Sequence, residues 1–243
     1  MIRGTTTSKL TRFGVERPKG IHSGIAHDLG VAIVSGKYPP GTLLSAEERF
    51  SDENKVSRGT YREAIRILAA KGLVYSRTKS GTRVQERSSW NMLDVDVLAW
   101  MFESQPSESF VRGIFELRSI VEPGAAALAA LRRDGRELAR MGHALEEMGR
   151  LGLQSAEGRA ADQTFHSLIL EAARNEPLVT LSSSIAAAVE WTTMFARREK
   201  TRLRDPMPDH FEVYDAIVQS DAEGARTKMA QLVANAFTDT GLA

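Results

Sequence analysis

The hydrophobic positions of the chain follow a helical spacing almost throughout, with one short stretch of β-like character near the front. A first group of apolar side chains recurs every three or four residues and predicts a helix; its members are Ile21, Ile25, Leu29, Ala32 and Ile33. The proline- and glycine-rich run KYPPGTLL follows and predicts an extended turn. Ser45, with Glu48 three residues later, forms a capping-box pattern that predicts a short second helix ending near Asn54.

A third helix is predicted to begin after Ser57 and to end at Gly72, with a buried stripe that includes Ile65, Leu68 and Ala69. The runs LVYS and TRVQE come next, and the glycine-containing loop between them predicts a β-hairpin. Helix, short helix, helix and hairpin is the order of a winged helix-turn-helix, whose third helix enters the DNA major groove. A module that binds another protein can have the same order, so the pattern leaves both functions open.

Past Trp90 the periodicity is helical to the end, and prolines stand at or before the predicted helix starts. We expect helices near residues 94–103, 107–131, 136–150, 158–173, 178–199, 206–219 and 222–238. The chain is therefore predicted to be mainly α. It divides into a flexible basic arm (1–20), a winged helix-turn-helix (21–87), a linker (88–93) and an all-helical antiparallel bundle (94–243).

The charges are distributed unevenly between these parts. Residues 1–90 contain 16 Lys and Arg against 8 Asp and Glu, whereas residues 91–243 contain 16 against 23. A basic front suggests a polyanionic partner. The chain has no cysteine, no apolar run of the ~20 residues that a membrane span needs, and no apolar segment in its basic N-terminus. We expect a cytoplasmic protein without disulfides or a secretory signal.

The first turns of the third helix contain residues that suit nucleic acid. Arginine can bond guanine bidentately, and a helix N-terminus favours a phosphate. The helix macrodipole disfavours cations at this end, so Arg58 and Arg62 there indicate an anionic partner. The alternative is a solvated face on which Glu63 pairs with a neighbour. The predicted DNA-contacting residues are Arg58, Thr60, Tyr61, Arg62, Arg49, and Lys79 and Gly81 of the hairpin.

A second candidate site lies in the helical part. Asp162 and His166 are four residues apart, which places both on one face of a helix, and His210 follows on a later helix. One Asp and two His can bind a divalent cation and leave a coordination position open, although an Asp-His pair within a helix is also a common hydrogen bond. His22, His27 and His143 show no comparable partners and are expected to be structural or solvated.

The front of the chain resembles the winged-helix domain of GntR-type bacterial transcription regulators. The matching positions are Val56-Ser57-Arg58, Arg62-Glu63-Ala64, Leu68, Gly72-Leu73 and Gly81 with Val84. The resemblance implies that Arg58 and Arg62 contact DNA and that Gly81 lies at the wing tip against a phosphate. The chain departs from the family pattern at Leu44-Ser45-Ala46-Glu47, which lacks the usual proline, and at Glu48, where an arginine is common and Arg49 follows.

Residues 90–243 resemble the FadR-like effector domain of this family, called FCD, through WNMLDVDVLAW, FELRSIVEPGAAALAA and DHFEVYDAIVQSD. The resemblance implies a homodimer and a divalent ion, zinc or nickel, held by Asp162, His166 and His210. The family's fourth ligand position falls near Leu232, where the sequence has no ligand. This leaves either a three-ligand site, whose open position would suit an effector carboxylate, or no metal site if the fourth ligand is required.

Two further effector-binding residues are expected from the same resemblance. Arg118 is expected to face the effector cavity, with an ion pair to Glu116 or Glu122 as the alternative. Trp191 is expected to line that cavity, on a helix that also carries Thr193 and Arg197.

Within the family, the chain looks closest to galactonate-type regulators, which implies a repressor of carboxylate or sugar-acid catabolism and not an enzyme. A metal-dependent enzyme that acts on a small carboxylate through Asp162, His166 and His210 is the alternative. The sequence shows no general base near these residues and no cofactor fingerprint to support it.

Overall fold

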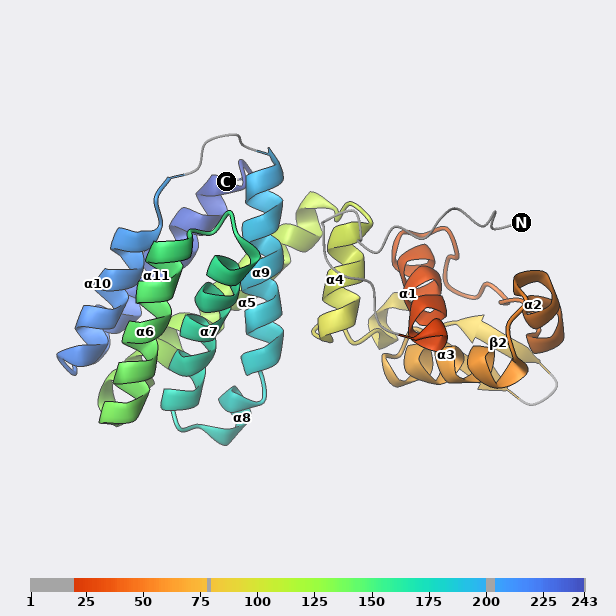
Figure 1. Ribbon diagram of the computed structural model, residues 1–243, viewed down its shortest axis with the longest axis horizontal. Coiled ribbons are helices and arrows are strands. Elements are labelled where there is room, and N and C mark those ends of the chain that lie inside the picture. Colours follow the sequence, from red (N-terminus) through yellow and green to blue (C-terminus); the bar gives the residue numbers. More distant parts are fainter. Residues whose placement is uncertain (1–19, 78–79, 200–203, 243) are drawn as a thin grey trace. The chain divides into compact units, whose positions relative to one another are not determined.

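The computed structural model describes residues 20–77, 80–199 and 204–242 (Figure 1). The chain forms two compact units, which meet in the sequence between Pro106 and Ser107. The predicted basic arm, apart from Gly20, and the predicted DNA-contacting residue Lys79 lie outside the described residues.

The first unit has the order of a winged helix-turn-helix (Figure 1). Its first elements are α1 (Ile21–Val34), α2 (Glu47–Asn54), α3 (Arg58–Ala70), β1 (Val74–Arg77) and β2 (Gly81–Val84). The two strands pair antiparallel with Val74 opposite Val84, and Leu43 adds an isolated bridge to Arg83. α1 packs against α3, and the buried side chains Leu29, Ile33 and Leu68 contribute to this core. The predicted fold is confirmed.

The helix starts in this unit agree with the sequence at one position and differ at another. Ser57 caps α3, because its Oγ accepts a hydrogen bond from the backbone N–H of Thr60 at 3.0 Å. The predicted capping box at Ser45 is wrong, since α2 begins after Ala46 without a side-chain cap. The backbone carbonyl of Ser45 instead accepts from the Tyr61 hydroxyl at 2.8 Å. Ala69, expected in the buried stripe of α3, is exposed.

A fourth helix, α4 (Val95–Glu103), packs against α1 after a short 3-10 turn (Arg87–Ser89). Gly30 of α1 allows the close approach, because a Cβ at this position would lie 2.3 Å from the Trp100 ring. Lys71 bonds both Asp94 and Asp96 at 2.7 Å. These contacts explain why the first compact unit continues to Pro106, past the predicted linker at 88–93.

His27 also joins α1 to α4. It is 5% exposed, and its ring nitrogens contact Glu103 at 2.8 Å and Asp28 at 3.1 Å. The expectation that His27 lacks partners is therefore wrong, because α4 brings Glu103 to it from 76 residues away. Burial opposes a charge on this ring, but the two carboxylates outweigh burial and raise its pKa to about 9.

The second unit is entirely helical in its described residues (Figure 1). Its helices are α5 (Glu108–Arg132), α6 (Gly135–Leu151), α7 (Ala156–Ala172), α8 (Glu176–Val179), α9 (Ser182–Glu199), α10 (Met207–Val218) and α11 (Ala222–Asp239). α5 packs on α11, α6 on α7, α7 on α9, and α10 on α11. The single helix predicted over 178–199 is two helices, because a turn at Thr180 separates α8 from α9. None of the described helices is long and apolar enough to cross a membrane.

Candidate functional sites

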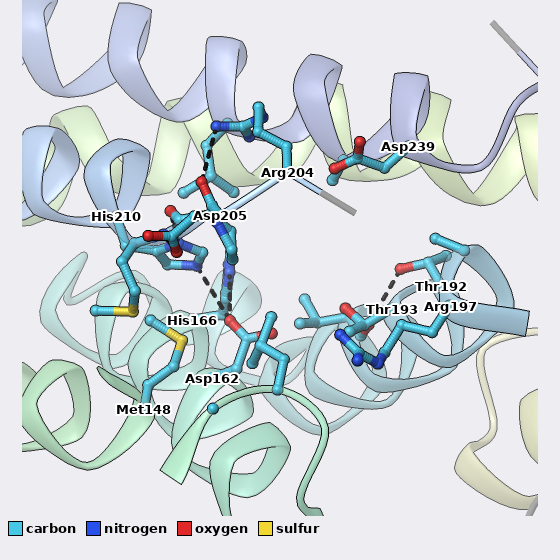
Figure 2. Close-up of a pocket in the computed structure, with 18 of the residues that line it drawn as sticks. Met148, Asp162, His166, Thr192, Thr193, Arg197, Arg204, Asp205, His210 and Asp239 are labelled. Carbon is cyan, nitrogen blue, oxygen red and sulfur yellow. Dashed lines mark hydrogen bonds and ion pairs between the residues drawn. The ribbon is translucent and has the colours of Figure 1, made fainter. Parts of the chain in front are cut away.

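Asp162, His166 and His210 converge inside the second unit (Figure 2). The first two lie one turn apart on α7, and His210 comes from α10. Asp162 Oδ1 is 3.1 Å from His210 Nε2 and 3.4 Å from His166 Nε2. One potential ligand atom of each residue lies within 4.8 Å of the others, and all three side chains are buried.

The far nitrogen of each histidine ring has a partner of its own. His210 Nδ1 donates to the backbone carbonyl of Pro206 at 2.8 Å, and His166 Nδ1 lies 2.5 Å from Glu122 Oε2. A histidine that ligates a metal usually donates its second N–H in this way, which fixes the tautomer and turns the other nitrogen toward the ion. Both Nε2 atoms face Asp162, so this donor set fits a divalent cation.

The charges of this cluster support one another. Burial opposes ionisation of Glu122, but Arg118 and His166 outweigh it and lower the pKa of this carboxyl to about 2. Burial likewise opposes the charge on Asp162, but hydrogen bonds with His166 and His210 lower its pKa. Glu122 and Asp162 outweigh burial at His166 and raise its pKa to about 9. The two buried carboxylates therefore remain ionised, and Arg118 and His166 offset their charge.

The cluster opens into a cavity of about 450 Å³ in the second unit (Figure 2). Its wall combines apolar side chains such as Phe115 and Met148 with polar ones contributed mainly by α7, α9 and the segment before α10. Leu232, at the position where a fourth ligand was considered, also lines the cavity and brings no ligand atom. The volume and the mixed wall suit a small polar molecule.

Arg118 of α5 lines this cavity and has buried partners. Its Nε donates to Glu122 Oε1 at 2.6 Å, and its Nη1 donates to Thr192 Oγ1 at 2.8 Å. Only 2% of the residue is exposed. Arg118 therefore both lines the cavity and pairs with Glu122, so the two expectations for this residue do not exclude each other.

α9 presents a different face to the cavity from the one expected. The lining residues of this helix follow the i, i+3, i+4, i+7, i+8 pattern of one helix face; they are Val189, Thr192, Thr193, Ala196 and Arg197. Trp191 is off this face and is not part of the cavity wall, although it is 5% exposed. Its placement in the effector site was wrong, because one position along a helix rotates a side chain by about 100°. Arg197 is half-buried, and in the described part of the chain no carboxylate pairs with it.

The candidate DNA-contacting arginines lie on the surface of the first unit. Arg62 pairs with Glu47 at 2.7 Å and Arg58 pairs with Glu48 at 3.1 Å. The side chains of Arg62 and Arg58 are 65% and 60% exposed. The glutamates of α2 thus offset the unfavourable position of two cations at the start of α3. Glu63 pairs with its neighbour Arg66 at 3.2 Å on the exposed face of α3, as the alternative interpretation expected.

The remaining predicted DNA contacts fall into two groups. Tyr61 is 4% exposed and stacks on Phe50, so its placement on the DNA face was wrong; its ring belongs to the core. Arg49 is exposed and pairs with Glu53, and the Thr60 hydroxyl bonds Ser57 at 2.8 Å. Gly81 begins β2 with a φ of 76°, which explains a glycine at this exposed hairpin position.

The sequence reasoning missed the role of Glu122. Glu122 was considered as a possible partner of Arg118, but not as a partner of His166. The spacing of Arg118 and Glu122 on one helix was the available signal for the first contact. The second contact arises from the packing of α5 on α7, for which the sequence carried no local signal.

Comparisons with known proteins agree with this architecture. Residues 22–84 match the bacterial regulatory proteins of the gntR family, and residues 113–235 match the FCD domain. The chain is 33% identical over 210 residues to the galactonate operon transcriptional repressor of Escherichia coli, covering 85% of this chain and 91% of that protein. It is 28% identical over 210 residues to the Uxu operon transcriptional regulator of the same organism, covering 84% and 80%. The solved structure of Lar, which controls the Listeria monocytogenes agr system, aligns with a TM-score of 0.60 at 22% identity, covering 92% of this chain and 99% of that one.

A winged helix-turn-helix matched by a bacterial regulatory family, followed by an all-helical FCD domain, is the architecture of a two-domain DNA-binding regulator. The chain belongs to the GntR family of transcription regulators and carries an FCD domain. Regulators of this family bind operator DNA, and the protein is a transcription regulator and not an enzyme.

Proposed function

We propose that the protein is a homodimeric repressor of an operon for the catabolism of a sugar acid or a similar carboxylate. An effector binds beside a divalent cation in the cavity of the second unit and lowers the affinity for operator DNA. The observation that carries this proposal is the cavity itself, which joins a three-residue ligand cluster to an arginine with no carboxylate partner in the described chain. The similarity to the galactonate operon repressor supports the choice of effector class.

Asp162, His166 and His210 would hold the cation, most simply zinc or nickel, since imidazole nitrogens suit both. A leucine at position 232 leaves the protein with three ligands in the described chain. A bound cation would supply positive charge that attracts and orients an oxyanion of the effector. Both histidines are already oriented for this role by Glu122 and by the Pro206 carbonyl.

Arg197 and Arg118 would bind the effector carboxylate. Partial burial and the charge of Arg159 lower the pKa of Arg197, so an anion beside it would relieve an unfavourable position. The guanidinium of Arg197 is directed into the cavity, near the hydroxyl-bearing Thr192 and Thr193 (Figure 2). Hydroxyl groups of a sugar acid are suitable partners for these threonines.

The first unit would read the operator through α3. Arg58 and Arg62 would contact base edges and phosphates, together with Thr60, Arg49 and the wing around Gly81; the exposure of both arginine side chains supports this. Two copies of α3 are needed to read two half-sites, which is why we propose a homodimer. Effector binding need only favour a dimer in which the spacing of the two α3 helices no longer matches the operator.

The test is fluorescence anisotropy of the full-length, zinc-loaded protein on its own upstream DNA, with a panel of sugar acids that includes D-galactonate. One acid is expected to weaken DNA binding by about 5- to 150-fold, the range of typical allosteric coupling. Arg197→Gln should abolish this response while leaving DNA affinity without acid unchanged. Arg198→Gln, which removes the same charge from an exposed neighbour, should respond like the wild type.

A wild-type protein that binds its operator but responds to no acid, and that binds no zinc, would refute the effector part of the proposal. Failure to bind its own upstream DNA under any condition would refute the assignment of the operator.

A further inference from the structure

One buried carboxylate contacts both halves of the proposed effector site. We propose that Glu122 is a positioning residue that couples Arg118 to the metal ligand His166, so that a change at one alters binding at the other. The inference rests on the proposed function, because it assumes that a cation binds at the Asp162, His166 and His210 cluster. It adds to that function a physical link between the carboxylate effector and the metal.

The geometry divides the two oxygens of Glu122 between two donors. Oε1 accepts from Arg118 Nε at 2.6 Å, and Oε2 accepts from His166 Nδ1 at 2.5 Å. Glu122 has 0% of its surface exposed, Arg118 has 2% and His166 has 1%. The side chains of α5 and α7 therefore form a continuous chain of charge-assisted hydrogen bonds that bulk water does not reach.

The two bonds compete for a single negative charge. A carboxylate that accepts from a metal-bound histidine increases the basicity of that ligand and strengthens its bond to the ion. Charge density that Arg118 draws toward Oε1 is lost to His166. An effector carboxylate that attracts Arg118 would leave more of the Glu122 charge for His166 and so strengthen cation binding. By linkage, the cation would then strengthen effector binding by the same factor.

Thr192 fixes the other end of the same guanidinium. Its Oγ1 accepts from Arg118 Nη1 at 2.8 Å and donates to the Ala188 carbonyl at 2.7 Å. Arg118 is thus held between Glu122 on its own helix and Thr192 on α9, and its position between them determines how strongly it draws on Glu122.

A double-mutant cycle on zinc affinity tests the link without an effector. Zinc binding to the full chain is measured by competition with a chromophoric chelator for the wild type, Arg118→Met, Glu122→Gln and the double variant. Glu122→Gln is expected to weaken zinc binding by about 10- to 100-fold. Arg118→Met is expected to tighten it, because Glu122 then serves His166 alone. In the Glu122→Gln background, the factor by which Arg118→Met raises zinc affinity should be smaller by about fivefold or more than in the wild-type background.

A purely structural role for Glu122 predicts a different result. The effect of Arg118→Met on zinc affinity would then be equal in the two backgrounds, and the proposed coupling would be overturned while the zinc site stands. A wild type that binds no zinc would instead refute the proposed metal site, and the coupling with it.

A milder pair of variants covers the case in which the buried charge variants do not fold. Thr192→Val removes the acceptor of Arg118 Nη1, which leaves Glu122 as the main partner of this arginine and should weaken zinc binding by about twofold or more. Thr180→Val, at an exposed position in the turn between α8 and α9 and away from the cavity wall, should leave zinc affinity unchanged. Equal zinc affinities of these two folded variants would overturn the proposal.

Discussion

Arginine–glutamate pairs occur in both units, in opposite surroundings. On the first unit, Arg58 and Arg62 each pair with a glutamate of α2, and their side chains are 60% and 65% exposed. In the second unit, Arg118 pairs with Glu122 at 2.6 Å, with 2% and 0% of the side chains exposed. The chemistry of the pairs is the same, but water reaches the first two and is kept from the third.

This difference separates two uses of the same ion pair. An exposed pair contributes about 0–1 kcal/mol, so a phosphate can replace the glutamate at little cost. Loss of one partner from a buried pair costs about 3–5 kcal/mol of stability, because the remaining charge is buried without a partner and is not solvated by water. The surface pairs therefore keep arginines ordered yet available for exchange, whereas the buried pair holds the cavity wall and His166 in place.

The largest expected effect comes from breaking the buried pair. Glu122→Ala should lower the free energy of unfolding by about 3–5 kcal/mol, because Arg118 is left buried without its carboxylate. Urea denaturation of the full chain, followed by circular dichroism, measures the loss. Glu171→Ala, which removes the exposed partner of Arg140, is the control and should cost no more than about 1 kcal/mol. Equal losses in the two variants would contradict the comparison.

The surface arginines should show the reverse behaviour. Arg62→Ala is expected to weaken operator binding by about 1–3 kcal/mol, roughly ten- to a hundredfold, while the urea midpoint stays unchanged. Anisotropy titrations at several salt concentrations measure this loss. Arg140→Ala removes the same charge from the second unit and should leave operator binding as in the wild type. An Arg62→Ala protein with full operator affinity would remove α3 from the proposed interface.

Much of the fold could be predicted because the hydrophobic spacing and the caps are local. Ser57 caps α3 as expected, and most helix ends fall within a few residues of the prediction. The failures occur where tertiary contacts override these local signals. Ser45 has the sequence of a capping box, but tertiary structure uses its carbonyl for Tyr61. Tyr61 was placed on the DNA face because it lies between Thr60 and Arg62 in the sequence, although its stacking on Phe50 puts its ring in the core.

The candidate site was predictable to a smaller extent. The spacing of Asp162 and His166 placed them on one face of a helix, and their approach to His210 agrees with the family resemblance. The link from His166 to Glu122 crosses 44 residues and depends on how α5 packs on α7. Trp191 was misplaced because membership of a helix does not give the rotation of that helix about its axis.

His27 is an intermediate case, a nearly buried pair that joins α1 to α4. The pKa of His27 is about 9 in the folded chain, above the ordinary value of 6.5. The charged ring therefore stabilises the folded state fully below pH 6.5, and this stabilisation is lost as the pH rises through 9. His27→Phe should therefore cost about 1–2 kcal/mol at pH 6, and the difference from wild type should fade above pH 9. Urea denaturation at pH 6, 7.5 and 9.5 measures this trend. His22→Phe, at an exposed position of α1, should show no such trend.

The smallest effect tests whether the exposed pairs exchange partners as proposed. Glu48 Oε1 lies 3.1 Å from Arg58 Nη1, and the Glu48 side chain is 71% exposed. If Arg58 contacts the operator as proposed, a carboxylate here would compete with DNA phosphates for Arg58 and would repel the DNA backbone. Glu48→Ala should therefore raise operator affinity by up to about fivefold, within the ~1 kcal/mol of an exposed pair. Glu223→Ala, which removes an exposed carboxylate from the second unit, is the matched control in the same anisotropy titration. If the Glu48→Ala protein binds DNA more weakly than this control, the glutamate orients Arg58 for the operator, and the surface pairs would resemble the buried one in function.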